Sequence, residues 1–206
     1  MSTIAFSIWL RMHPSMKVAE ITSRMMHFFL FFALLFPTVT GYLSNFPGWS
    51  IGLSYPEIIN YDELLGIPSL PFRTIAGIVG AIMMLIGFGF MSISVVVLLD
   101  RGQGLPAFAL SKKLAAKDIY KYTRNPMSLG FYLIFIALGL LAGSTFFTLW
   151  SLLAVIPAHI TFLKYFEERE LEVRFGKLYK EYKQRVPFLI PNFSKVSGTE
   201  SANNND

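Results

Sequence analysis

Three long apolar runs without a formal charge constrain the fold of this chain more than any other feature. They cover residues 25–43, 74–99 and 127–163. A helix needs about 20 apolar residues to cross the roughly 30 Å hydrocarbon core of a membrane, so the first two runs each predict one spanning helix. The third run has 37 residues and would form a helix of about 55 Å, which is too long for a single crossing.

The middle of the third run contains Gly143-Ser144-Thr145, a sequence suited to a tight turn. We therefore interpret this run as a helical hairpin of two short spans. Together with the first two runs it predicts an all-α membrane protein with four transmembrane helices.

Composition supports a membrane protein. Hydrophobic residues make up 53% of the chain and charged residues 15%, whereas soluble domains carry about 25% charged residues. The 20 Phe, 9 Tyr and 3 Trp exceed what the core of one small soluble domain accommodates. This composition excludes a disordered chain and argues against a soluble enzyme.

The basic residues flank the apolar runs, a pattern typical of membrane topology and contact with a lipid bilayer rather than with nucleic acid. Residues 1–24 hold three Lys or Arg, residues 100–126 hold six and residues 164–206 hold eight, whereas residues 25–72 hold none. The positive-inside rule then predicts a multi-pass protein with both termini and the 100–126 loop in the cytoplasm, and the acidic loop 44–71 outside.

Several chemistries are excluded by residue type. The chain has no Cys, which rules out thiolate catalysis, disulfides and Cys-ligated zinc. No two of its three histidines, His13, His27 and His159, have a metal-binding spacing, so we predict no metal site. Charges within residues 11–24 interrupt the first apolar stretch, so we expect no cleavable signal peptide.

The remaining segments define the predicted organisation. Residues 1–99 form an N-terminal membrane region with two spans, residues 100–192 a cofactor-binding region with the helical hairpin, and residues 193–206 a disordered tail. Residues 4–10 suggest an interfacial helix. Residues 164–185 predict a cytoplasmic amphipathic helix, stabilised by i,i+4 pairs such as Glu170 with Arg174 and ended by Val186-Pro187.

Polar residues suited to chemistry gather in residues 102–130 and 167–191. Arg124 and Asn125 precede Pro126, which opens an apolar helix whose free N–H groups and positive dipole end attract a carboxylate. Glu167 and Glu168 follow the last apolar run and are placed to hold a hydroxyl, an amine or a cationic ligand. We expect a polar site at the membrane face that binds a zwitterionic cofactor.

These residues resemble a known family. Arg124-x-Pro126-x-x-x-Gly130, followed by Glu167-Glu168 and then by Phe175-Gly176, Tyr179, Tyr182 and Val186-Pro187, is similar to the signature of the isoprenylcysteine carboxyl methyltransferase and phospholipid methyltransferase superfamily of integral membrane enzymes. The resemblance covers residues 102–191, under half of the chain.

The resemblance implies S-adenosylmethionine as the methyl donor. By position it assigns catalytic roles to Arg124, Glu167 and Glu168. It assigns cofactor binding to Lys113, Leu114, Ala115, Tyr120, Asn125, Pro126, Met127, Ser128, Glu168 and Tyr179. Three positions depart from the family pattern: Asn125 stands where many members have His, Ser128 where many have Tyr, and Asp118 where Gly is usual.

Methyl transfer from a sulfonium donor tolerates a sparse site, because positioning supplies much of the rate. A carboxylate or thiolate acceptor needs no base, whereas an amine or an alcohol needs one, for which Glu167, Glu168 and Tyr179 are candidates. The acceptor is lipophilic or small. Prenylcysteine, phosphatidylethanolamine, a fatty acid and a small thiol all fit.

Two other functions remain open: an NADPH-dependent enzyme similar to sterol reductases, and an inactive membrane protein that retains the fold. Simpler roles also exist for single residues. The lysines of the 100–126 loop can serve topology alone, and Glu167 and Glu168 can be a solvated first helical turn. His159 should face the helix bundle as a hydrogen-bonded packing residue, and the glycines of the second run suggest close helix packing.

Overall fold

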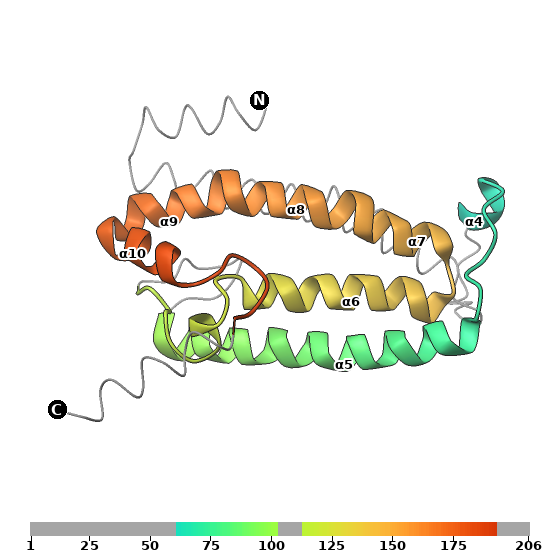
Figure 1. Ribbon diagram of the computed structural model, residues 1–206, viewed down its shortest axis with the longest axis horizontal. Coiled ribbons are helices and arrows are strands. Elements are labelled where there is room, and N and C mark those ends of the chain that lie inside the picture. Colours follow the sequence, from blue (N-terminus) through green and yellow to red (C-terminus); the bar gives the residue numbers. More distant parts are fainter. Residues whose placement is uncertain (1–60, 103–112, 193–206) are drawn as a thin grey trace, which may run out of the picture.

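The computed structural model describes residues 61–102 and 113–192. Three long helices lie side by side (Figure 1). They are α5 (Arg73–Val97), α6 (Pro126–Ala142) and a continuous third helix made of α7 (Thr145–Trp150), α8 (Ile156–Phe162) and α9 (Glu168–Phe175). Every regular element in these described ranges is helical, in agreement with the predicted all-α class.

Two of these helices are long and apolar enough to cross a membrane. They are Arg73–Gly102 with 30 residues and Thr145–Phe175 with 31 residues, whereas α6 is a shorter apolar helix of 17 residues. The predicted first span 25–43, the interfacial helix 4–10, most of the outer loop, residues 103–112 and the tail 193–206 lie outside the described residues. The count of four spans and the sidedness of the chain therefore stay predictions.

A tight turn joins α6 to α7 at the place that the sequence predicts. Gly143 ends α6 with a left-handed φ of 68°, and its N–H reaches back to the carbonyls of Gly139 and Leu140. Ser144 then caps α7, because its side-chain oxygen accepts a hydrogen bond from the N–H of Phe147 at 3.2 Å. The short helix α4 (Tyr61–Leu64) packs on this turn (Figure 1), with Tyr61 stacked on the ring of Phe146.

Glycines allow α5 and α6 to pack with their backbones in close contact. A Cβ atom on Gly87 would lie 2.8 Å from the carbonyl oxygen of Gly130, and one on Gly130 would lie 2.6 Å from the carbonyl oxygen of Gly87. Small residues at helix contacts are typical of membrane helices, where close van der Waals packing drives association. The sequence prediction of close helix packing is confirmed for Gly80 and Gly87, whereas Gly77 and Gly89 have open space around them.

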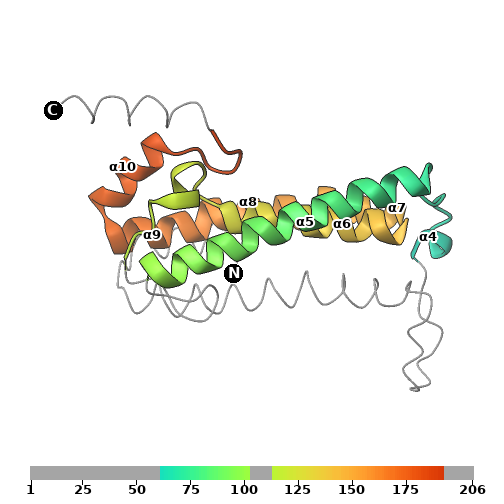
Figure 2. The ribbon, with the colours of Figure 1, turned by 90° about the horizontal axis from the view of Figure 1, so that it is seen from below.

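The prediction of one amphipathic helix over residues 164–185 is wrong. Residues 164–175 continue the long third helix, through a π-helical turn at Leu163–Glu167 and then α9. The helix ends at Gly176, whose φ of 53° and ψ of −124° suit glycine. The helix α10 (Lys177–Arg185), the last one in the described residues, then turns back toward the start of α6 (Figure 2).

Candidate functional site

The loop before α6 positions Tyr120 through an unusual backbone conformation. Asp118 has a left-handed φ of 55° and opens the 3-10 turn Asp118–Lys121. Tyr120 is thereby buried against Ala115 and Val97 of α5, and its carbonyl accepts a hydrogen bond from the hydroxyl of Tyr182 at 2.7 Å. Asp and Asn tolerate this region better than most residues, so Asp118 preserves a loop shape for which glycine is the usual choice.

The residues just before α6 are held by the segment that follows α10. The Arg124 N–H donates to the carbonyl of Pro187 at 2.9 Å, and the Thr123 hydroxyl donates to the carbonyl of Leu189 at 2.8 Å. The side-chain amide of Asn125 donates to the carbonyl of Phe188 at 2.9 Å. This last contact requires only an N–H donor. Asn supplies one.

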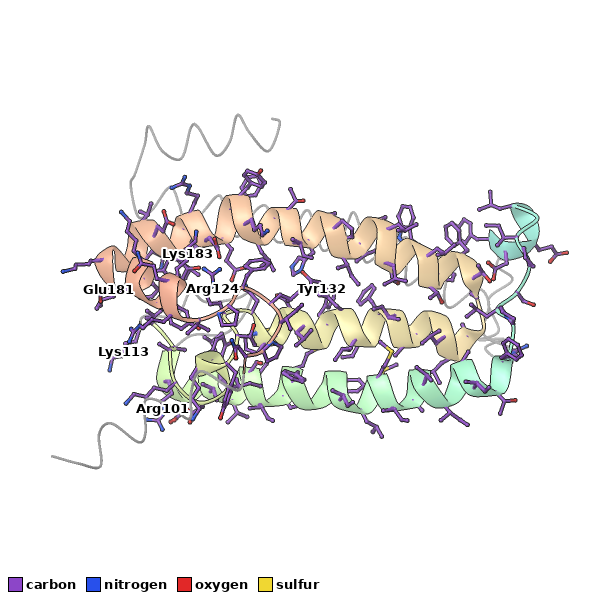
Figure 3. The ribbon with its side chains drawn as sticks, viewed as in Figure 1. Arg101, Lys113, Arg124, Tyr132, Glu181 and Lys183 are labelled. Carbon is purple, nitrogen blue, oxygen red and sulfur yellow. The ribbon has the colours of Figure 1, made fainter. Side chains whose placement is uncertain are left out.

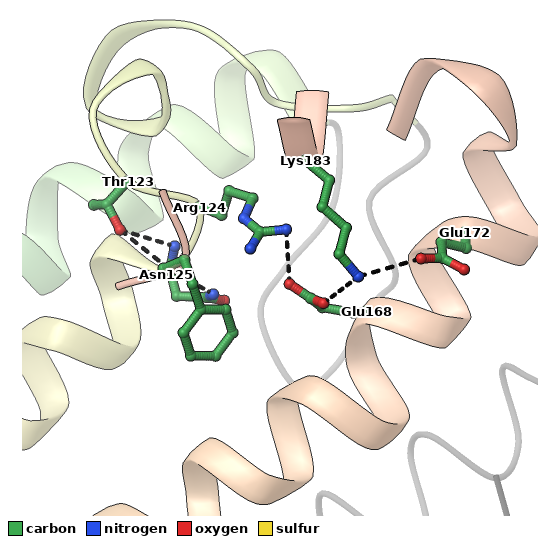
Figure 4. Close-up of polar contacts among 7 residues, drawn as sticks. Thr123, Arg124, Asn125, Glu168, Glu172 and Lys183 are labelled. Atoms are coloured by element: carbon green, nitrogen blue, oxygen red, sulfur yellow. Dashed lines mark hydrogen bonds and ion pairs between the residues drawn. The ribbon is translucent and has the colours of Figure 1, made fainter. Parts of the chain in front are cut away.

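A network of buried charges connects α6, α9 and α10 (Figure 4). The Nη1 atom of Arg124 lies 2.8 Å from Oε1 of Glu168, and the two side chains are each 9% exposed. The second carboxylate oxygen of Glu168 lies 2.6 Å from Nζ of Lys183, which is also 3.3 Å from Glu172. Both oxygens of Glu168 are thus held by cations, and this carboxylate ties three helices together.

Arg124 keeps donor capacity inside this network. Its Nε is buried with no hydrogen-bond partner in the described part of the chain. Its Nη1 contacts Glu168 as an ion pair without the alignment of a directed hydrogen bond. The guanidinium also lies 5.6 Å from the ring centroid of Phe188, whose ring is 5.1 Å from Nζ of Lys164. A buried N–H donor beside a helix N-terminus is suited to an anionic group of a ligand.

Two buried tyrosines of α10 complete the site. Tyr179 and Tyr182 are only 2% and 4% exposed. Burial raises the pKa of Tyr179 far above its ordinary value, and the nearby Glu168 carboxylate raises this pKa further. Burial likewise raises the pKa of Tyr182. Both side chains are therefore neutral phenols at physiological pH, which argues against Tyr179 as a general base.

The structure brings together only part of the predicted site. Arg124, Glu168 and Tyr179 are neighbours, and Glu167 is half-buried with its carboxylate in electrostatic reach of Tyr120 and Tyr179. Asn125 and Pro126 directly follow Arg124. Met127 and Ser128 are half-buried in the first turn of α6.

Within the described residues, no ion pair joins the segment 113–115 to the charge network. The Lys113 side chain is exposed and lies at the same end of the bundle as Arg124 and Lys183, near Arg101 (Figure 3). Its N–H donates to the carbonyl of Gly102 at 3.1 Å. Leu114 is half-buried, and Ala115 packs in the small apolar cluster with Tyr120.

Sequence reasoning missed Lys183, Thr123 and Phe188. Lys183 is missed because one uninterrupted helix over 164–185 would carry it far from Glu168. Gly176 was the available signal, since glycine commonly ends a helix and lets the chain reverse. The described residues contain no group of three or more His, Asp or Glu that could hold a metal ion.

Comparison with known proteins defines the family. The phospholipid methyltransferase model matches residues 75–178, half of the chain, and the chain belongs to this family of membrane methyltransferases. The resemblance inferred from the Arg-Asn-Pro and Glu-Glu motifs is confirmed at this level.

Two curated relatives come from Bradyrhizobium diazoefficiens. They are methanethiol S-methyltransferase 2 and methanethiol S-methyltransferase 1, each 40% identical to this chain over 74 residues. The shared segment covers 35% of this chain and about a quarter of the length of each relative, 27% and 24% respectively. No solved structure matches the chain significantly.

Proposed function

We propose that this protein is a multi-pass membrane enzyme that transfers a methyl group from S-adenosylmethionine to a small thiol. The observation that carries the proposal is the buried Arg124–Glu168–Lys183 network at the start of α6. Arg124 and Glu168 lie within residues 75–178, which match the phospholipid methyltransferase family, and Lys183 follows shortly after that segment.

The residues present fit a zwitterionic methyl donor. The buried Nε of Arg124 lacks a protein partner in the described ranges, and together with the N–H groups of the first turn of α6 it suits a carboxylate. Glu167 and the phenol of Tyr179 lie close by and suit the ammonium and hydroxyl groups of such a ligand. When bound, the donor supplies a methyl carbon activated by a sulfonium.

Glu168 and Tyr179 are poorly suited to act as a general base, which favours an acceptor that loses its proton readily. Both oxygens of Glu168 are held by Arg124 and Lys183, so Glu168 would have to give up an ion pair to take a proton. Tyr179 is a neutral phenol. A thiol, with an ordinary pKa of about 8.5, ionises far more readily than an alcohol. The names of the two methanethiol S-methyltransferases support the same choice of acceptor.

Binding to the purified protein in detergent tests the donor. We expect S-adenosylhomocysteine to bind in calorimetric titration and NADPH not to bind. Glu168→Gln should weaken binding at least 10-fold, whereas Lys177→Ala, at a side chain that is 90% exposed, should change it little. Binding of NADPH alone would instead assign the protein to the reductase-like alternative, and binding of neither ligand by a folded sample would refute the proposal.

Transfer of a radiolabelled methyl group tests the acceptor. We expect product with methanethiol and none with phosphatidylethanolamine or prenylcysteine presented in the same detergent. Binding of S-adenosylhomocysteine without transfer to any acceptor would identify the inactive protein that retains the fold.

A further inference from the structure

A polar side-chain pair lies inside the apolar helix bundle, and the ion-pair network does not use it. Tyr132 of α6 points toward α8 (Figure 3), and its hydroxyl lies 3.0 Å from Nδ1 of His159. The sequence prediction of a hydrogen-bonded His159 facing the bundle is confirmed. Ionisable groups within membrane-spanning helices are costly and usually serve function, so this pair calls for a role beyond packing.

Aromatic rings surround the pair. The ring of Phe131 lies 5.5 Å from the ring of His159, and the ring of Phe162 stacks on the ring of His159 at 6.1 Å. Phe166 continues the stack from Phe162 toward Glu168 at 5.4 Å. A hydroxyl and an imidazole within aromatic surroundings suit a ligand that is small and apolar but carries one polar, ionisable atom, as an alkyl thiol does.

The pair lies on the inner side of the proposed donor site. Tyr132 is six residues beyond Pro126 on α6, or about 9 Å along the helix. His159 precedes Glu168 by nine residues along the third helix. The Glu167 carboxylate interacts electrostatically with Tyr132 as well as with Tyr179. The pair therefore lies deeper in the helix bundle than the donor site, and a ligand held at Tyr132 would present its polar atom to the donor from that side.

We propose that Tyr132 and His159 bind the thiol acceptor and remove its proton, an inference that rests on the proposed function. An apolar environment disfavours a free thiolate, so proton removal must accompany methyl transfer in the bundle. The thiol S–H bond breaks and its proton passes to the Tyr132 oxygen, while the Tyr132 proton passes to Nδ1 of His159. The tautomer of His159 that carries its proton on Nε2 is required.

The electrons balance in the same step. The sulfur lone pair of the acceptor forms the new S–CH₃ bond, and the electron pair of the broken sulfonium C–S bond stays on the departing donor sulfur. His159 ends as an imidazolium and returns its proton to water after product release.

Two conservative variants test this role. His159→Asn keeps a hydrogen-bonding side chain but cannot take a proton at neutral pH, and Tyr132→Phe removes only the hydroxyl. With ethanethiol as acceptor we expect kcat/KM to fall about 10²- to 10⁴-fold in each variant. With thiophenol, a more acidic thiol that needs less assistance, we expect a much smaller loss. Ser151→Ala is the matched control, because it removes a buried hydrogen bond to the carbonyl of Phe135 between the same two helices.

Binding measurements separate this inference from the proposed function. Affinity for S-adenosylhomocysteine should be unchanged in both variants, and saturation-transfer NMR should detect ethanethiol binding to the donor-free protein, weakened in Tyr132→Phe. Equal losses with both thiols while S-adenosylhomocysteine still binds, or variants as active as the wild type, would overturn the acceptor role alone. Failure of the wild-type protein to bind S-adenosylhomocysteine would instead refute the proposed function.

Discussion

Arg124 and Glu168 join the start of α6 to the start of α9 through a buried contact of 2.8 Å between Nη1 and Oε1. Lys183 of α10 completes the arrangement by binding the other oxygen of Glu168 (Figure 4). Arg124 and Glu168 are thus enclosed with little solvent around them, whereas Lys183 is 36% exposed. Removing the carboxylate would leave the buried guanidinium uncompensated, which is more costly than losing a surface ion pair.

Glu168→Gln should therefore destabilise the protein by about 3–5 kcal/mol. The matched control is Glu172→Gln, which weakens the 3.3 Å contact with Lys183 and the 3.0 Å i,i+3 pair with Arg169, both with partly exposed cations, and should cost about 1 kcal/mol or less. Thermal or denaturant unfolding in detergent measures both. Equal destabilisation by the two variants would show that the Arg124–Glu168 contact contributes no more to stability than a partly exposed ion pair.

The sequence alone predicts the long helices and their turn because these depend on local signals. Uncharged runs define α5 and α6, and Gly143 with Ser144 supplies both the left-handed residue and the cap that a reversal needs. The break at Gly176 is harder to predict, because the charged residues on either side continue a favourable helical pattern. Only the tertiary contact of Lys183 with Glu168 shows which alternative the chain adopts.

The site is predicted in part for a similar reason. Motif spacing identifies Arg124 and Glu168 individually, but their pairing depends on how α6 and α9 are packed. The effect of the departures at Asn125 and Asp118 also depends on tertiary structure. Asn125 is engaged with the Phe188 carbonyl, and Asp118 adopts the left-handed conformation itself. Neither fact follows from the spacing of residues along the chain.

Asp118 should tolerate glycine better than a branched residue. A left-handed φ costs most L-residues about 1–2 kcal/mol, and glycine avoids this cost. Asp118→Gly also loses the 3.6 Å contact with Arg101, which is solvent-exposed and contributes little. We expect the melting temperature of Asp118→Gly to equal or exceed that of the wild type and that of Asp118→Val to fall. A higher melting temperature for the valine variant would contradict the left-handed assignment.

Gly130→Ala should disrupt the contact of α5 with α6. The added Cβ atom would lie 2.6 Å from the carbonyl oxygen of Gly87 and 2.9 Å from the backbone N of Met91, so the two helices must move apart. We expect a loss of about 1–3 kcal/mol, typical of overpacking. Gly89→Ala on α5 is the control, because a Cβ atom there meets nothing within 4 Å and alanine favours the helix. Similar unfolding curves for the two variants would refute the close approach.

The buried tyrosines predict a loss of stability at alkaline pH. Burial raises the pKa of Tyr120, Tyr179 and Tyr182 in the folded protein, whereas the unfolded chain titrates near the ordinary value of about 10. Above that pH the unfolded state has lost protons that the folded state keeps. The free energy of unfolding must then fall as pH rises, by about 1.4 kcal/mol per pH unit for each such tyrosine.

Tyr179→Phe isolates one of these contributions. Below about pH 9 Tyr179 stays protonated in both the folded and the unfolded wild-type protein. The free energy of unfolding should therefore not depend on pH through this residue. Above about pH 10 the variant should lose stability less steeply than the wild type, by about 1.4 kcal/mol per pH unit. Denaturant unfolding at a series of pH values, with phenolate absorbance followed in parallel, measures this difference. Parallel slopes for the two proteins would mean that Tyr179 titrates alike in the folded and unfolded states, and its burial near the Arg124–Glu168 pair would then be wrong.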